Sequence, residues 1–183
     1  MFRQFYSRSC ERYRENYPAL RLLYAKPGKL GKMKILSKAA VIFTYAMYAV
    51  GLLTAVRQFI GLPLLLFRVV HFTAVPFASF LFTTIARKAI NAPRPYEQGV
   101  EPLIPKSTSG LSFPSRHTTC VTAIALAWLT VSPLAGCIMA VCAVYIGASR
   151  IISGVHYPLD VICGALVSVV IFAVSSVIMY FVF

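Results

Sequence analysis

The sequence has few acidic residues, with five Asp and Glu against 18 Lys and Arg among 183 residues. Asp160 is the only aspartate. Sites for hard divalent cations are built largely from carboxylate oxygens. So small a supply of acids predicts that the chain holds no metal ion, and we also expect no cofactor.

Cysteine is also sparse, and its pattern excludes two classes of site. The five cysteines form no Cys-x-x-Cys pair, their number is odd, and four lie in apolar segments. They are expected to be small buried hydrophobic residues, without a disulfide framework or a zinc site. The first 36 residues contain no apolar run of the kind that a cleavable signal peptide needs, so we predict no signal peptide.

The formal net charge of +13 would suggest a nucleic-acid partner in a soluble protein. Much of this charge, however, lies before residue 39, directly ahead of an apolar run, and no nucleic-acid motif accompanies it. A basic segment beside a membrane span is typically cytoplasmic and faces anionic lipid. We therefore expect no nucleic-acid partner and a cytoplasmic N-terminus.

Long apolar runs dominate the rest of the chain, which is 58% hydrophobic with a mean hydropathy of +0.74. A membrane-spanning helix needs about 20 apolar residues. The expected spans cover residues 39–56, the segment from after Gly61-Leu-Pro63 to 86, and residues 115–131, 134–148 and 158–183. The predicted fold is all-α, an integral membrane helical bundle with about five transmembrane helices, or six if the N-terminal segment re-enters the membrane. Residues 1–36 form a basic segment that can adopt an amphipathic helix on the membrane surface, and residues 37–183 form the transmembrane domain.

Three polar stretches lie at the ends of these spans, at residues 87–95, 112–118 and 147–160. Following the chain through its crossings places the end of the second span, the start of the third, the end of the fourth and the start of the fifth on one membrane face. Span counting therefore predicts that all three stretches meet at one mouth of the bundle. Polar residues at such a place indicate a functional site.

The converging stretches are rich in permanent cations: Arg87, Arg94, Arg116 and Arg150, with Lys88 as a potential fifth. Arginine forks match phosphate oxygens in a bidentate way. Ser115 follows a proline at a helix start, where backbone N–H groups can bind an anion. We predict that Arg87, Arg94, Ser115, Arg116 and Arg150 bind a phosphate group.

Two histidines supply reactivity. His156 and Asp160 are four residues apart, so they share one face if a helix begins near residue 158. A carboxylate that accepts one ring N–H leaves the other nitrogen as a nucleophile or base. His117 comes from another span and can face His156 across the phosphate, so that one histidine attacks phosphorus and the other protonates the leaving oxygen.

These residues resemble the three-part signature of the type 2 phosphatidic acid phosphatase superfamily, on the motifs Arg87-x6-Arg94-Pro95, Pro114-Ser115-Arg116-His117 and Ser149-Arg150-x5-His156-x3-Asp160. The resemblance implies a lipid phosphatase in residues 37–183. It implies His156 as nucleophile, Asp160 as its orienting partner, His117 as general acid, and Arg87, Arg94, Ser115 and Arg150 on phosphate. Two positions depart from the family pattern: Arg87 stands where lysine is usual, so Arg87 or Lys88 makes the contact, and Arg116 stands where glycine is frequent.

The resemblance leaves several alternatives open. The substrate is a membrane lipid phosphate such as undecaprenyl diphosphate, phosphatidylglycerophosphate or phosphatidate. Phosphotransfer to an acceptor other than water, and non-catalytic binding or transport of a lipid phosphate, remain alternatives. We expect a multi-pass protein of the bacterial cell membrane, with a site facing the cytoplasm if the basic tail lies there and facing outward otherwise. The sequence does not define an oligomeric state.

Overall fold

The computed structural model describes residues 2–59, 64–105 and 107–182. Within these ranges the chain forms helices and no strand, which confirms the predicted all-α class. The elements are α1 (Phe2–Tyr24), α2 (Pro27–Phe59), α3 (Leu64–Ile90), the short 3-10 helix η1 (Pro95–Gln98), α4 (Arg116–Leu129), α5 (Pro133–Ile152) and α6 (Pro158–Val182). The connection predicted at residues 61–63 lies outside the described residues.

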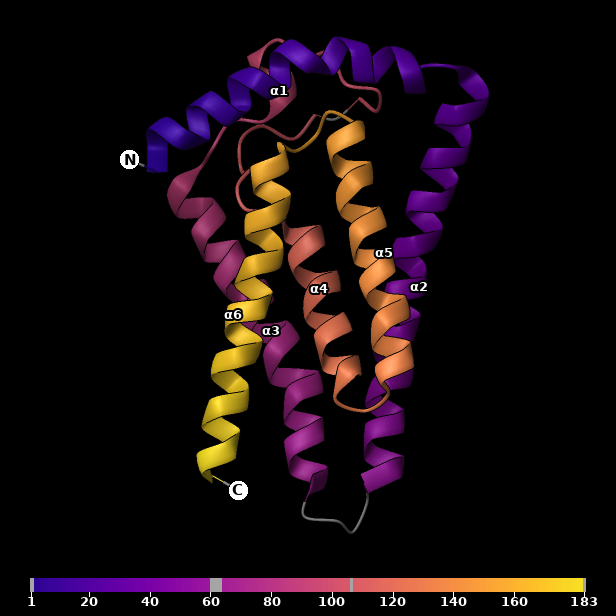
Figure 1. Cartoon of the computed structure of the whole chain (residues 1–183), viewed down its shortest axis with the longest axis vertical. Coiled ribbons are helices and arrows are strands. Elements are labelled where there is room, and N and C mark those ends of the chain that lie inside the picture. The colour runs from indigo at the N-terminus through magenta and orange to yellow at the C-terminus, as the bar shows by residue number, and fades with distance from the viewer. Residues whose placement is uncertain (1, 60–63, 106, 183) are drawn as a thin grey trace.

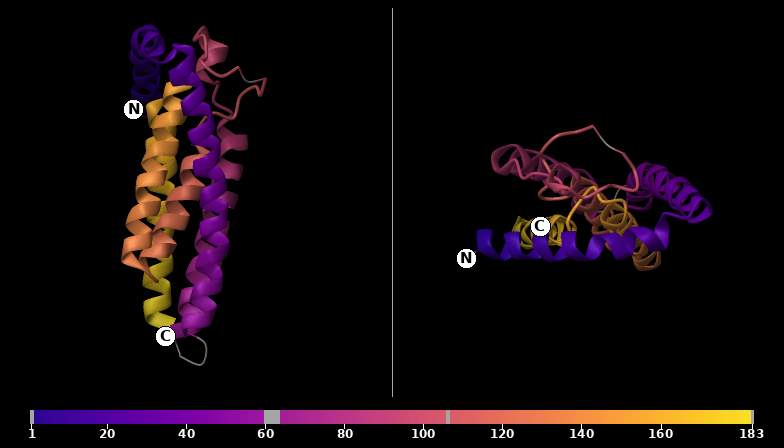
Figure 2. Two further views of the ribbon diagram at one scale, coloured as in Figure 1. Left: turned by 90° about the vertical axis from the view of Figure 1, so that its right-hand side faces the viewer. Right: turned by 90° about the horizontal axis from the view of Figure 1, so that it is seen from above.

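Helices α2 to α6 run side by side and form the bundle, whereas α1 lies across one end of it (Figure 1 and Figure 2). The long loop between α3 and α4 and the turn between α5 and α6 lie at that same end. Because α1 crosses the bundle end instead of running along the bundle, the structure does not follow the six-span alternative. The predicted boundary after residue 36 falls inside α2, and the helical break comes earlier, between the end of α1 at Tyr24 and the start of α2 at Pro27.

Among the described residues, four helices, α2, α3, α5 and α6, are long and apolar enough to cross a membrane. They present large apolar side chains to the outside, including Ile42, Leu53, Phe77, Val144 and Val177. Such a broad exposed apolar surface fits contact with lipid. The chain is thus a multi-pass membrane protein.

Helix α4 differs from the other members of the bundle. Its 14 residues span about 21 Å at the 1.5 Å rise of an α-helix, which is less than the ~30 Å hydrocarbon core of a bilayer. It packs against α3, α5 and α6 and is buried among them. The expected third span is therefore a central, enclosed helix, whose N-terminal end lies deeper than the neighbouring helix ends (Figure 1).

The middle of the bundle holds the main apolar core. Phe72 of α3 and Trp128 of α4 meet edge to face at 5.6 Å between ring centroids. Gly51 of α2 lies against both rings, and a Cβ there would come within 2.2 Å of the Phe72 ring. The indole N–H of Trp128 donates to the carbonyl of Met47 at 3.0 Å. These contacts hold α2 close to α3 and α4.

A second, aromatic cluster attaches α1 to the bundle end. One stripe of α1 buries Cys10, Tyr13 and Tyr17 against Tyr157 and Val100. The phenol of Tyr13 donates to the carbonyl of Ile151 at 2.6 Å, and that of Tyr17 to the carbonyl of Ile152 at 3.1 Å. This stripe gives the N-terminal segment a fixed place over the turn between α5 and α6.

Gly154 makes this close approach possible. It has a φ of 74°, and a Cβ at this position would lie 2.6 Å from the Tyr17 hydroxyl. A side chain would thus be strained by the backbone conformation and would also collide with α1.

Candidate active site

The three polar stretches meet around one cavity of about 260 Å³ at the α1 end of the bundle. Its walls come from the end of α3, the following loop, the start of α4, the end of α5 and the turn before α6. The lining residues are Thr84, Arg87, Lys88, Arg94, Thr108, Leu111, Arg116, His117, Arg150, Val155 and His156. The convergence that span counting predicts is present in the structure.

Asp160 lies in the first turn of α6, where a carboxylate is favoured by the free N–H groups of a helix start. Its Oδ2 accepts the backbone N–H of Tyr157 at 2.9 Å, so that the carboxylate caps its own helix. The same oxygen lies 3.3 Å from Nδ1 of His156. The spacing of four residues therefore lets one side chain fix both the helix start and the imidazole.

Two further hydroxyl groups donate to this carboxylate. Ser112 Oγ donates to Oδ2 of Asp160 at 2.6 Å and lies 3.4 Å from Nδ1 of His156. Tyr6, on α1, donates to Oδ1 of Asp160 at 2.8 Å. Asp160 is completely buried, and these donors stabilise its charge there.

His156 is buried, with 2% of its surface exposed. Burial lowers its pKa, and the charges of Arg94 and Arg87 lower it further, while the hydrogen bond and charge of Asp160 oppose the shift. The lowered pKa favours the neutral imidazole, and the Asp160 carboxylate, which only accepts when ionised, favours the tautomer with the proton on Nδ1. Its Nε2 keeps an available lone pair.

Arg87 and Arg94 are held in place by backbone carbonyls. Both are buried, at 7% and 8% exposed. Nη1 of Arg87 donates to the carbonyl of Pro114 at 3.1 Å, and Nε of Arg94 donates to the carbonyl of Gly110 at 2.9 Å. Each guanidinium uses some of its N–H donors to bind backbone carbonyls, and its other donors can bind a ligand in the cavity.

The loop that holds Arg94 is organised by Glu97. This side chain accepts the backbone N–H groups of Arg94 at 2.7 Å and of Gly110 at 2.9 Å. It also accepts the hydroxyl of Ser109 at 2.6 Å. The carboxylate thereby links the two ends of the loop and places the Gly110 carbonyl where it accepts the Arg94 hydrogen bond.

Arg150 and Lys88 complete the positive lining. Nε of Arg150 is buried and has no hydrogen-bond partner among the residues that the structure describes. Such a buried donor favours an anionic ligand at the site. Lys88 is exposed and lines the same cavity as Arg87, so the structure places both candidates for the first-motif contact at the cavity wall.

Ser115 is not among the cavity-lining residues. It is fully buried, its N–H donates to the carbonyl of Asp160 at 2.8 Å, and its hydroxyl pairs with Thr118 Oγ1 at 3.1 Å. Gly164 allows this approach, because a Cβ there would lie 2.7 Å from the Ser115 carbonyl. These contacts give Ser115 a role in joining the starts of α4 and α6, and its phosphate contact stays a prediction.

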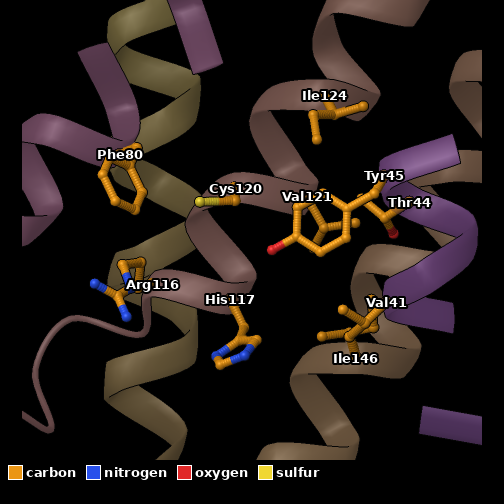
Figure 3. Close-up of a pocket in the computed structure, with 10 residues that line it drawn as sticks. All are labelled: Val41, Thr44, Tyr45, Phe80, Arg116, His117, Cys120, Val121, Ile124 and Ile146. Carbon is orange, nitrogen blue, oxygen red and sulfur yellow. The ribbon is translucent and has the colours of Figure 1, made fainter. Parts of the chain in front are cut away.

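Arg116 and His117 occupy the first turn of α4, and both are exposed. The guanidinium of Arg116 lies over the ring of Phe80, 5.4 Å from its centroid. Both residues also line a second, mainly apolar cavity of about 310 Å³, whose other walls are Val41, Thr44, Tyr45, Phe80, Cys120, Val121, Ile124 and Ile146. Figure 3 shows His117 at the boundary between the charged end and these apolar side chains.

The sequence interpretation did not assign two residues of this site. Ser112 was inside a recognised polar stretch, and its position directly before Phe113-Pro114 gave no sign of a partner at Asp160. Tyr6 lies 154 residues from Asp160, and no local pattern connects them. Within the described ranges, no group of three or more His, Cys, Asp or Glu could hold a metal ion. The expectation of no metal and no cofactor stays a prediction.

Comparison with known sequences finds that residues 68–183 match the model of the PAP2 superfamily. Lipid A 1-phosphatase from Rhizobium etli is 35% identical over 98 residues, 51% of this chain and 42% of that protein. The bacitracin transport permease protein BcrC from Bacillus licheniformis is 47% identical over 58 residues, 32% of this chain and 29% of that protein. The matches thus cover less than half the length of these curated relatives.

Two solved structures share the arrangement of helices. LpxE from Aquifex aeolicus superposes with a TM-score of 0.59 at 25% identity, covering 86% of this chain and 92% of that one. The first transmembrane PAP2 type phosphatidylglycerolphosphate phosphatase from Bacillus subtilis superposes with a TM-score of 0.52 at 19% identity, covering 94% of this chain and 96% of that one. At 19% identity, the likeness to the Bacillus subtilis structure shows a shared fold and nothing about activity.

Proposed function

The chain belongs to the PAP2 superfamily, and from this premise we propose that it hydrolyses a phosphomonoester or diphosphate on a membrane lipid. We propose that the reaction needs no metal ion and passes through a phosphohistidine intermediate. One observation carries the proposal: His156, held through Nδ1 by Asp160, lines the same cavity as Arg87, Arg94 and Arg150. A nucleophile and a set of cations for a phosphate group therefore share one enclosed space.

In the first step, Nε2 of His156 attacks phosphorus and forms a P–N bond while the bond from phosphorus to the lipid oxygen breaks. His117 gives its proton to that leaving oxygen. Arg87, Arg94 and Arg150 hold the remaining phosphate oxygens and stabilise the charge of the transition state. Arg116 and His117 of the first turn of α4 line the same cavity, and a helix start favours an anion nearby.

In the second step, His117 takes a proton from water, and the resulting hydroxide attacks phosphorus. The P–N bond breaks, inorganic phosphate leaves, and His156 returns to the neutral state. Asp160 stabilises the positive charge that His156 carries while it is phosphorylated. Ser112 and Tyr6 act as positioning residues, because they contact the carboxylate and not the phosphate.

The apolar cavity beside His117 supports a lipid as the leaving group. A chain that enters between α2, α3 and α4 reaches the phosphate cavity at Arg116 and His117. The named relatives act on lipid A and on phosphatidylglycerolphosphate. We propose lipid phosphates of this kind, with phosphatidate and undecaprenyl diphosphate as further candidates.

Binding or transport without catalysis remains the alternative from another class, and one relative is named as a transport permease. The presence of both histidines at the cavity favours catalysis, because a pure binder needs cations but no acid or nucleophile. Transfer to an acceptor other than water would use the same intermediate, and product analysis separates it from hydrolysis.

We propose that the site faces the cytoplasm of a bacterial cell membrane. The site and the basic helix α1 lie at the same end of the bundle (Figure 1), so the side of one determines the side of the other. The many Lys and Arg before residue 39 favour the inside. A Thr108→Cys variant, in a background without other cysteines, would resist an impermeant thiol reagent in intact cells; labelling there would place the site outside.

The test of the activity uses purified protein in neutral detergent with phosphatidate, phosphatidylglycerophosphate, undecaprenyl diphosphate and lipid A, each with and without EDTA. We expect release of inorganic phosphate from at least one lipid, unchanged by EDTA. Tight binding of a lipid phosphate with no release would support the transport alternative. Activity that EDTA removes would contradict the metal-free mechanism.

A further inference from the structure

A third cavity, of about 530 Å³, adjoins the phosphate cavity on the side of α2. The two cavities share His117, Arg150 and Val155. The third cavity is otherwise lined by Lys34, Ser37, Lys38, Val41, Ile42, Ile104 and Ser153. His117, the proposed acid for the leaving oxygen, lines both cavities, so a leaving group that His117 protonates can extend into this third space.

The lining of this cavity is basic and lacks a compensating acid. Lys34 and Lys38 are one turn apart on α2 and line the same cavity, and neither forms an ion pair with a described residue. Two like charges at this spacing repel each other and destabilise the helix slightly. Arg150 adds a third cation, with its buried Nε lacking a hydrogen-bond partner among the described residues. An anion in this cavity would compensate these positive charges.

Side-chain contacts fix the face of α2 that carries these lysines. The hydroxyls of Ser37 on α2 and Ser149 on α5 pair at 3.2 Å and are buried. Ser37 lies between the two lysines in sequence, so this contact turns that part of α2 towards the end of α5. Lys34 and Lys38 thereby line the same cavity as Arg150, whereas Lys29 and Lys32 line none of the three cavities described above.

The same helix continues from the basic cavity into the apolar one. Val41 lines both, and Thr44 and Tyr45 follow along the apolar cavity. An anionic group near Lys34 and Lys38 and an apolar chain beyond Val41 could thus belong to one lipid lying along α2.

We propose that Lys34 and Lys38, together with Arg150, bind a second anionic group of the lipid substrate, located on its leaving-group side. The proposal rests on the proposed phosphatase function and narrows it to lipids that carry another phosphate near the bond that is cleaved. Both lysines lie outside residues 68–183, the part that matches the family model. The selectivity is accordingly a property of the N-terminal part of this chain.

The test compares two lipids with identical acyl chains in neutral detergent. Phosphatidate loses its phosphate from an uncharged diacylglycerol, whereas phosphatidylglycerophosphate loses it from a group that retains a phosphodiester. The variant K34A/K38A should raise KM for phosphatidylglycerophosphate about tenfold and leave kcat and the constants for phosphatidate unchanged. The variant K34R/K38R should restore the wild-type KM, and K29A/K32A, on the same helix, should change neither substrate.

Three results would overturn the inference. An equal loss for both lipids would make the lysines a general contact with the micelle or with the fold. An unchanged KM for phosphatidylglycerophosphate would show that the lysines do not bind the substrate. Restoration of the wild-type selectivity by added anionic lipid would show that the cavity binds the headgroup of a neighbouring lipid. Turnover of neither lipid by the wild-type protein would remove phosphatidylglycerophosphate as a substrate without contradicting the proposed function, which release of phosphate from lipid A or undecaprenyl diphosphate would uphold.

Discussion

The two histidines of the site lie in contrasting surroundings. His156 is 2% exposed, and its partner Asp160 is held by a backbone N–H and two hydroxyls. His117 is exposed and stands where three cavities meet. The side of the site that holds His156 is closed and already ordered, and the side that holds His117 is open.

This difference suits two different tasks. A nucleophile gains from a fixed tautomer and a fixed direction of attack, which burial and hydrogen bonds provide. A residue that protonates a lipid leaving group must border the space that the lipid occupies. Changes on the closed side should therefore affect every substrate, and changes on the open side should depend on the leaving group.

The largest effect is expected from exchanging the two histidines for alanine. His156→Ala should lower kcat at least about a thousandfold for any phosphate ester, because no P–N bond can form. His117→Ala should do the same for a lipid phosphate but keep the first-turnover release of p-nitrophenol from p-nitrophenyl phosphate, whose leaving group needs no proton. Later turnovers should stay slow in this variant, because the second step also uses His117. The first-turnover release of p-nitrophenol and the steady-state release of phosphate are the measurements, with helical content as the control for folding. Equal losses of the first-turnover release in both variants would contradict the division of roles.

A smaller effect is expected on the open side, from filling the apolar cavity. Cys120→Phe should raise KM for a long-chain lipid about tenfold, which corresponds to losing the burial of roughly two methylene groups at ~0.8 kcal/mol each. Hydrolysis of p-nitrophenyl phosphate should not change. Cys142→Phe, the same exchange on α5 outside the cavity lining, serves as the control. Loss of both activities in Cys120→Phe alone would show damage to the site instead of a lipid path.

A further test concerns the contribution of α1 to the closed side. Tyr6→Phe removes one donor to Asp160 and should lower kcat about fivefold without raising KM, because the carboxylate keeps its other donors. Tyr13→Phe removes a similar phenol from the same helix, but its partner is the carbonyl of Ile151. We expect kcat to be unchanged in that variant. Equal effects of the two changes would mean that α1 acts only by its packing.

The smallest effect is a displacement of the pH profile. Burial lowers the pKa of His156 from the ordinary 6.5, so its neutral form persists as pH falls through that value. The acid limb of kcat/KM should therefore have its midpoint below pH 6.5. The fold should lose stability as pH falls from 6.5 towards that midpoint, because the unfolded chain binds a proton there that the buried His156 does not. A midpoint above 6.5 would mean that Asp160 outweighs burial and the two arginines.

The local sequence pattern was sufficient to predict the helices and to bring together most of the residues that line the site. Apolar runs long enough to cross a membrane predict α2, α3, α5 and α6, because their length and composition are properties of consecutive residues. The spacing of His156 and Asp160 predicts their contact for the same reason, since four residues make one helical turn. Span order alone brings Arg87, Arg94, His117 and Arg150 to one bundle end.

Tertiary structure decided what depends on contacts between distant segments. Ser115 has the sequence features of an anion site, yet its N–H is taken by the carbonyl of Asp160, 45 positions further along the chain. Tyr6 reaches the same residue across 154 positions, because a stripe of tyrosines places α1 over the bundle end. The enclosed position of the short α4 likewise follows from its neighbours. The amino-acid sequence shows which side chains can bind or react with a phosphate. Which hydrogen-bond donors are already occupied follows from helix packing, because it depends on the backbone carbonyl that lies opposite each donor.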